Sequence, residues 1–186
     1  MKYINVLLFS LLSLSCSAES NISHDAKTVE KLLNSFFTGQ DINIKPKFKQ
    51  GDFNGDGVDD IAVLFTPKSK PKETSQLKVL TPWIYPNTKP SDNYRKSLAI
   101  FQSTKGKWAL DKIHVYALLD TNGVLETPSF QLLSTSRKDK NYSEHASMLP
   151  IKTKNDLIIL PTEAGIDTYI YWDKDTYKLF EPEEMP

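Results

Sequence analysis

The sequence predicts an α+β fold, mainly β, in which one N-terminal amphipathic helix packs on an antiparallel sheet of about seven strands. Helical spacing of apolar residues is clear only once, near the start of the chain after residue 25. Short apolar runs separated by turn residues follow it toward the C-terminus. This order favours antiparallel pairing and argues against alternating βαβ units.

The first 18 residues have the organisation of a secretory signal. Lys2 precedes an apolar run from about Val6 to Leu14, and small residues follow. The run is shorter than the roughly 20 apolar residues that span a bilayer. We therefore expect residues 1–18 to be a signal peptide and residues 19–186 to form a single globular domain, in the periplasm, at the outer membrane or outside the cell.

Two interpretations of Cys16, the only cysteine of the chain, remain open. Residues 13–16, SLSC, resemble a bacterial lipobox, in which Cys16 would be lipidated and become the mature N-terminus. The alternative is cleavage after Ala18. A lipid on Cys16 would be the only membrane attachment that the sequence suggests. In neither case does the folded domain contain a disulfide bond, so its core alone must hold it together.

The helix is predicted over DAKTVEKLLNSFFTG, with Asp25 as its N-cap and Gly39 as its stop. Apolar residues recur there at the spacing i, i+3, i+4, i+7 and i+8, which places them on one helical face. They are Val29, Leu32, Leu33, Phe36 and Phe37. We interpret this stripe as a core face.

Strands are predicted where apolar runs lie between turn residues. Single runs occupy residues 61–65, 78–85, 127–133 and 156–160. Two hairpins are also predicted, one turning at Lys105-Gly106 and one at Asp173–Asp175. Pro82 makes 78–85 a predicted edge strand because proline cannot donate to a ladder. The basic, proline-interrupted residues 67–77 are predicted to form a loop.

The stretch GDFNGDGVDD, directly before the run 61–65, places four aspartates within nine residues. Counting from Asp52, oxygen donors fall at positions 1, 3, 5, 7 and 9, the spacing with which a short loop wraps Ca²⁺. The donors are the side chains of Asp52, Asn54, Asp56 and Asp60 and the main-chain carbonyl of Val58. Asp59 falls between these positions and is expected to face solvent, while Phe53 is expected to anchor the loop to the core.

A metal-free turn is the alternative, since Asn-Gly and Asp-Gly are common hairpin-turn dipeptides. We favour the metal, because a bare turn does not require acidic residues at alternate positions, where they repel one another. An EF-hand is excluded, because position 12 is Val63 rather than a bidentate glutamate and a strand rather than a helix is predicted to follow.

The sequence DFNGDGVDDIAVLF resembles the DxDxDGxxD calcium loop of FG-GAP and VCBS-type repeats, with asparagine at the third position. The resemblance implies a Ca²⁺ ion held by Asp52, Asn54, Asp56, Val58 and Asp60. The motif occurs once, whereas a propeller needs several blades of roughly 40–50 residues. We therefore expect a small secreted bacterial protein with a single such loop, and not a full propeller.

The remaining sequence favours a binding module over an enzyme. It lacks a GxSxG elbow, an HExxH motif, a glycine-rich phosphate loop and a catalytic cysteine. Its net charge of zero, with both signs mixed, argues against a nucleic-acid partner. We expect a non-enzymatic module with one structural Ca²⁺ that presents some of its many aromatic side chains to a protein or glycan partner.

The alternative function is a small extracytoplasmic hydrolase whose acidic residues assemble only in three dimensions. Its candidate residues are the three histidines of the chain and a few acids: His24, His114, His145, Glu144, Asp120 and Glu163. For each histidine a structural or solvated role is the favoured interpretation.

Overall fold

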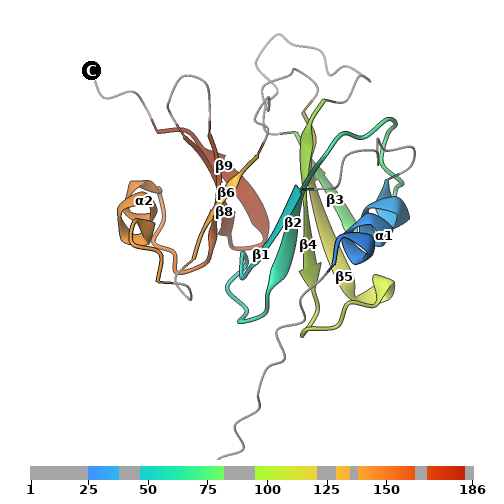
Figure 1. Cartoon of the computed structure of the whole chain (residues 1–186), viewed down its shortest axis with the longest axis horizontal. Coiled ribbons are helices and arrows are strands. Elements are labelled where there is room, and N and C mark those ends of the chain that lie inside the picture. Colours follow the sequence, from blue (N-terminus) through green and yellow to red (C-terminus); the bar gives the residue numbers. More distant parts are fainter. Residues whose placement is uncertain are drawn as a thin grey trace, which may run out of the picture.

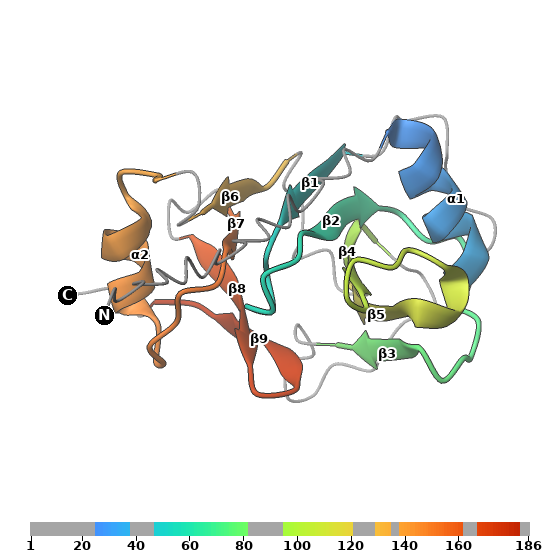
Figure 2. The same ribbon diagram turned by 90° about the horizontal axis from the view of Figure 1, so that it is seen from below.

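The computed structural model describes residues 25–37, 47–81, 95–120, 129–134, 138–161 and 167–182. Within these ranges the chain forms four layers, which follow one another across the molecule as helix, sheet, sheet and helix (Figures 1 and 2). The two outer layers are the helices α1 (Ala26–Phe36) and α2 (Tyr142–Met148). The predicted signal, residues 1–18, lies outside the described residues.

The sheet next to α1 has five strands in the order β1-β2-β4-β5-β3. Its strands are β1 (Lys47–Gly51), β2 (Asp60–Phe65), β3 (Leu77–Leu80), β4 (Ser97–Ser103) and β5 (Ile113–Leu118). All neighbours are antiparallel except β3 and β5, which run parallel. The central strands β2 and β4 are buried along their whole length, because they have a layer on each side.

The second sheet is fully antiparallel and has the order β6-β7-β8-β9. Its strands are β6 (Gln131–Leu133), β7 (Leu157–Leu160), β8 (Thr168–Asp173) and β9 (Thr176–Phe180). Its inner face meets the five-stranded sheet, and α2 covers its outer face (Figure 1).

Three apolar clusters fill the spaces between the four layers. The first joins α1 to the outer face of the five-stranded sheet, and the third joins α2 to the outer face of the second sheet. The middle cluster lies between the sheets and includes Leu64 and Ile100 from one and Ile158 and Ile170 from the other. Burial of apolar surface in these clusters is the main force that holds the layers together.

The predicted N-terminal helix is confirmed, together with its buried apolar face. All five residues of the predicted stripe are buried, and four of them lie within the helix itself. Asp25 is the N-cap, and its side chain accepts a hydrogen bond of 2.8 Å from the amide of Thr28. The helix ends at Phe36, before the predicted stop at Gly39, because Phe37 already has extended backbone angles.

Several predicted strands and turns are also confirmed. β2, β7 and the hairpin of β8 and β9 lie where the apolar runs predict them, and β3 is an edge strand. Lys105, Gly106 and Lys174 have positive φ, as tight turns between strands require. A short 3₁₀ helix, η1 (Leu110–Lys112), separates the Lys105-Gly106 turn from β5. Parts of the predicted strands 78–85 and 127–133 lie outside the described residues.

The coarse class, mainly β with α+β content, is confirmed, but the prediction of one helix on one sheet of about seven strands is wrong. The described residues contain two helices and nine strands in two sheets. The sheets are stacked and are not arranged as the blades of a propeller (Figure 2). None of the described helices is long and apolar enough to cross a membrane.

Candidate metal centre

The acidic loop connects β1 to β2 and turns sharply at two glycines. Gly55 has φ +79° and Gly57 has φ +85°, a region of backbone space that other residues rarely adopt. The two strands that flank the loop pair directly, with Gly51 opposite Asp60. The loop is therefore held at both ends by one antiparallel ladder.

Asp52 organises the turn by accepting hydrogen bonds from three main-chain amides. Its Oδ1 accepts from Gly55 at 2.7 Å and from Asp56 at 3.1 Å, and its Oδ2 accepts from Gly57 at 3.0 Å. Burial raises the pKa of Asp52, and the charge of Asp56 adds to this, while the amides of the turn act in the opposite direction. The first predicted ligand thus already faces the inside of the loop.

Asn54 and Asp56 extend the same network. The Asn54 Oδ1 accepts from the Asp56 amide at 3.0 Å, and the Asn54 Nδ2 donates to the Asp56 Oδ2 at 3.2 Å. The Asp56 Oδ1 accepts from the Val58 amide at 2.9 Å. Three of the predicted ligand side chains, from Asp52, Asn54 and Asp56, therefore lie within one hydrogen-bonded turn.

Asp60 is the most deeply buried aspartate of the loop. It is fully buried, and its Oδ2 accepts from the Phe53 amide at 3.2 Å, but its Oδ1 has no hydrogen-bond partner. Burial raises the pKa of Asp60 well above its usual range, and the nearby charges of Asp56 and Asp52 raise it further, while the main-chain amides of Phe53 and Asn54 act in the opposite direction. Leaving a buried carboxylate oxygen unsatisfied is costly, and a bound cation is one way to satisfy it.

The carboxyl of Asp60 sits at the inner face of its sheet, toward the second sheet. Its neighbours along β2 on that face, Ala62 and Leu64, belong to the cluster between the sheets. From β9, Tyr177 is buried there, and its hydroxyl accepts a hydrogen bond of 2.7 Å from the Nε2 of Gln102. Burial raises the pKa of Tyr177, and the charge of Asp60 raises it further.

The structure confirms two of the smaller predictions for the loop. Asp59 is exposed, and Phe53 is only 1% exposed because its ring packs in the cluster between the sheets. In the part of the chain that the structure describes, no three His, Cys, Asp or Glu side chains gather closely enough to form a metal cage by themselves. The predicted ligand set also draws on an amide and a main-chain carbonyl oxygen, as Ca²⁺ sites commonly do.

Sequence reasoning missed two residues that lie against the loop, Asn155 and Asp156. Both lie directly before β7, and the Asp156 Oδ2 accepts from the Asp52 amide at 3.0 Å. Asp156 is only 5% exposed. One sequence signal was available: an aspartate directly precedes the apolar run LIIL, just as Asp60 directly precedes IAVLF.

Among the candidate catalytic residues that the structure describes, His114 and Asp120 lie on or next to β5, whereas Glu144 and His145 lie on α2. His145, on α2, makes a 2.7 Å contact between its Nδ1 and the hydroxyl of Tyr169, whereas His114 is exposed on β5. Asp120 is buried just after β5, and its amide donates to the Oγ of Ser97 at 3.2 Å. His24 and Glu163 lie outside the described residues.

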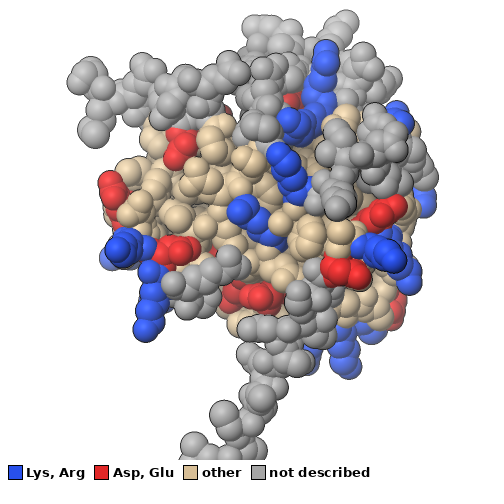
Figure 3. Space-filling model, in the orientation of Figure 1, with Lys and Arg blue, Asp and Glu red and all other residues tan. Residues whose placement is uncertain are grey.

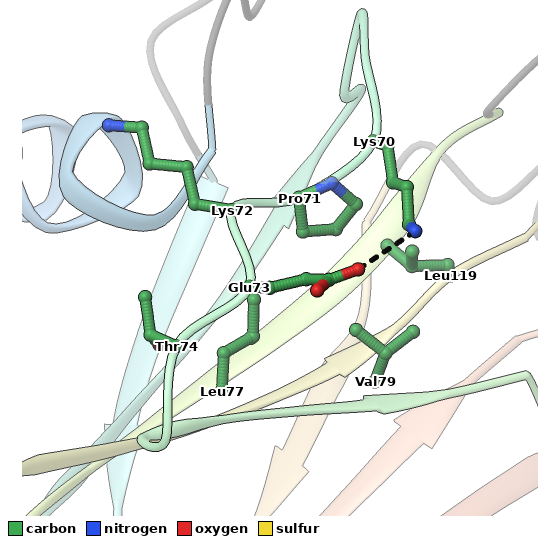
Figure 4. A pocket seen from close by; sticks show the side chains of 8 residues that line it. All are labelled: Lys70, Pro71, Lys72, Glu73, Thr74, Leu77, Val79 and Leu119. Carbon is green, nitrogen blue, oxygen red and sulfur yellow. Dashed lines mark hydrogen bonds and ion pairs between the residues drawn. The ribbon is translucent and has the colours of Figure 1, made fainter.

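A pocket of about 300 Å³ lies where residues 70–74 pass beside β3 (Figure 4). Its apolar side chains include Leu77, Val79 and Leu119. The Nζ of Lys70 pairs with Glu73 at 3.0 Å, and Lys72 points away from the other side chains toward α1, where its Nζ donates to two main-chain carbonyls. The charged groups around the pocket thus already have protein partners.

Comparison with protein-family models, with curated proteins and with solved structures gave no match. The resemblance of the loop to FG-GAP and VCBS-type repeats therefore rests on the residues of the loop alone.

Proposed function

We propose that this protein is a non-enzymatic binding module of the bacterial cell envelope or exterior, stabilised by one structural Ca²⁺ in the loop 52–60. Asp52, Asn54, Asp56 and Asp60 would supply side-chain oxygens, and Val58 its main-chain carbonyl. The proposal places the protein outside the cytoplasm on the pattern of residues 1–18, either released or held by a lipid on Cys16. Its partner would be a protein or a glycan.

One observation carries the calcium proposal: the Oδ1 of Asp60 is buried without a hydrogen-bond partner, close to two further carboxylates. A turn that binds no metal gives no reason for a buried carboxylate oxygen without a partner at this position. A hard divalent cation would satisfy it and would also remove the repulsion among Asp52, Asp56 and Asp60. The glycines at 55 and 57 give the turn the curvature that such a site requires.

The arrangement of side chains gives more support to binding than to hydrolysis. His114 and His145 lie on different layers, and His145 packs against Tyr169 in the α2 cluster. On the face shown in Figure 3, basic and acidic side chains both occur and neither sign covers the surface, which fits a partner other than nucleic acid. Three of the aromatic residues of the chain, Trp83, Tyr85 and Tyr94, lie outside the described residues.

Thermal unfolding in 10 mM CaCl₂ and in EDTA tests the proposal. Extracellular Ca²⁺ modules bind with dissociation constants of about 10⁻⁴ to 10⁻³ M, so saturation at this concentration should raise Tm by about 3 to 11 °C. Asp56→Ala should abolish the rise. Asp59→Ala is the matched control, because it removes the same charge from an exposed position between the ligands, and it should keep the rise.

An equal Tm in calcium and EDTA for the unmodified protein would leave the loop as a metal-free acidic turn. A rise that survives in Asp56→Ala would show that calcium binds elsewhere.

A further inference from the structure

We propose that the loop 52–60 is the joint between the two sheets, so that calcium binding and the packing of the second sheet on the first stabilise each other. In this account Asp156 is a positioning residue: it does not touch the ion but fixes the first ligand, Asp52. The inference rests on the proposed calcium site.

The main chain of Asp52 is bound on both sides by Asp156. The Asp52 amide donates to the Asp156 Oδ2 at 3.0 Å, and the Asp156 amide donates to the Asp52 carbonyl at 2.8 Å. Asp156 directly precedes β7, the second strand of the four-stranded sheet. Asp52 therefore turns its side chain into the loop while its peptide groups belong to the contact with the other sheet.

The loop also packs closely against residues 155 and 156 at the glycines Gly51 and Gly55. A Cβ atom added at Gly51 would lie 2.6 Å from the Asp156 Oδ2, and one added at Gly55 would overlap the side chain of Asn155. Real Cβ atoms essentially never show contacts this short, so only glycine lets the main chain lie this close to the side chains of Asn155 and Asp156.

Two further contacts carry the connection deeper into the molecule. Phe53, inside the loop, is buried between the sheets in the same cluster as Ile158 of β7. The carbonyl of Asn155 accepts a hydrogen bond of 2.7 Å from the hydroxyl of Tyr142, the first residue of α2. A path of direct contacts thus runs from the loop to the second sheet and to the helix behind it.

Coupling of this kind is reciprocal. If calcium tightens the contact between Asp52 and Asp156, then loss of that contact must weaken calcium binding by the same factor. Partners that orient metal ligands without touching the metal typically change its affinity about 10- to 100-fold when they are removed. We therefore expect Asp156→Ala to weaken calcium affinity by about 10-fold or more.

The test is a calcium titration by calorimetry on the intact protein, on Asp156→Ala and on a matched control, Asp139→Ala. Asp139 also lies beside the second sheet, and its Oδ2 likewise accepts from a main-chain amide, that of Ser134, at 2.7 Å. This hydrogen bond joins two segments beside the second sheet and does not involve the loop 52–60, so its loss should lower stability and leave calcium affinity unchanged. Hydrogen exchange of the unmodified protein in CaCl₂ and EDTA supplies a second readout that needs no substitution.

In that exchange experiment, calcium should slow exchange in residues 155–160 as well as in the loop. Calcium binding with equal affinity in Asp156→Ala, or protection confined to residues 52–60, would contradict the proposed coupling between the loop and the second sheet. It would not contradict the calcium site itself. No binding by the unmodified protein would overturn both. If Asp156→Ala does not fold, the exchange pattern of the unmodified protein decides.

Discussion

Replacing Asp60 with asparagine is expected to change stability in opposite directions with and without calcium. In EDTA at neutral pH, Asp60→Asn should unfold at a higher temperature than the unmodified protein. In CaCl₂ it should unfold at a lower temperature, because it lacks a charged ligand. A Tm difference between the two proteins that changes sign between EDTA and CaCl₂ indicates a buried metal ligand. For an aspartate that stabilises only the turn, the difference would have the same sign in both conditions.

The physical reason lies in the pKa of Asp60, which burial and the charges of Asp56 and Asp52 raise. A carboxyl with a higher pKa in the folded state binds more protons when folded. Such a carboxyl therefore lowers the free energy of unfolding at pH values above its pKa in the unfolded chain, about 3.9. The loss grows with pH until the pH passes the pKa in the folded protein. Asparagine keeps an acceptor for the Phe53 amide but never ionises, so it removes this loss in the metal-free protein.

The expected gain in EDTA is about 1–3 kcal/mol, the scale on which an unsatisfied buried polar group destabilises a protein. This corresponds to a rise in Tm of about 2 to 12 °C. In the absence of calcium the gain should shrink as the pH is lowered toward 4, because Asp60 is then protonated in the folded protein and no longer buries a charge. An Asp60→Asn protein that is less stable than the unmodified one in EDTA would contradict the account.

Asp52→Ala is expected to be the most damaging substitution of a predicted calcium ligand in the loop. Its carboxylate accepts hydrogen bonds from the amides of Gly55, Asp56 and Gly57. Their loss should cost about 1–3 kcal/mol even in EDTA. In calcium, the lost ligand should add about 1.4–2.7 kcal/mol at 10 mM, if the dissociation constant lies in the usual extracellular range.

Chemical denaturation in EDTA and in CaCl₂ measures both contributions to the destabilisation by Asp52→Ala, the lost amide hydrogen bonds and the lost calcium ligand. Asp52→Asn is the matched variant, since it keeps one acceptor oxygen and should fall between alanine and the unmodified protein. Asp59→Asn, at an exposed position of the same loop, should change stability little in either condition. Equal stability of Asp52→Ala and the unmodified protein in EDTA would show that the three amide bonds do not hold the loop.

Much of the local structure could be predicted from the sequence, because it depends on neighbouring residues. The stripe of α1, its cap at Asp25 and the hairpin of β8 and β9 are local patterns of this kind. β1 was missed, because KFKQG has a single large apolar residue and becomes a strand through its ladder with β2. α2 was missed because it has seven residues and is held by the burial of Tyr142 and the contact of His145 with Tyr169.

The division into two sheets was also missed, although the sequence contained a signal for it. The runs IAVLF, LAIF and LIIL are apolar at consecutive positions, and each is buried on both faces in the structure. Such strands need a layer on each side, which one helix cannot provide. The parallel pairing of β3 with β5 depends on the path of the chain between distant segments and has no local signal.

The candidate site divides in the same way. The spacing of its oxygen donors, the burial of Phe53 and the exposure of Asp59 follow from the loop itself. The contact with Asp156 does not, because that residue directly precedes a strand of the other sheet, more than a hundred positions later in the chain. The loop is thus predictable as a local motif, whereas its place between the sheets is a property of the whole fold.

The most direct test of the central claim is a calorimetric titration of the protein with CaCl₂. The account predicts one site per chain with a dissociation constant of about 10⁻⁴ to 10⁻³ M, and loss of that binding in Asp56→Ala but not in Asp59→Ala. The absence of binding to the unmodified protein at millimolar calcium would contradict it.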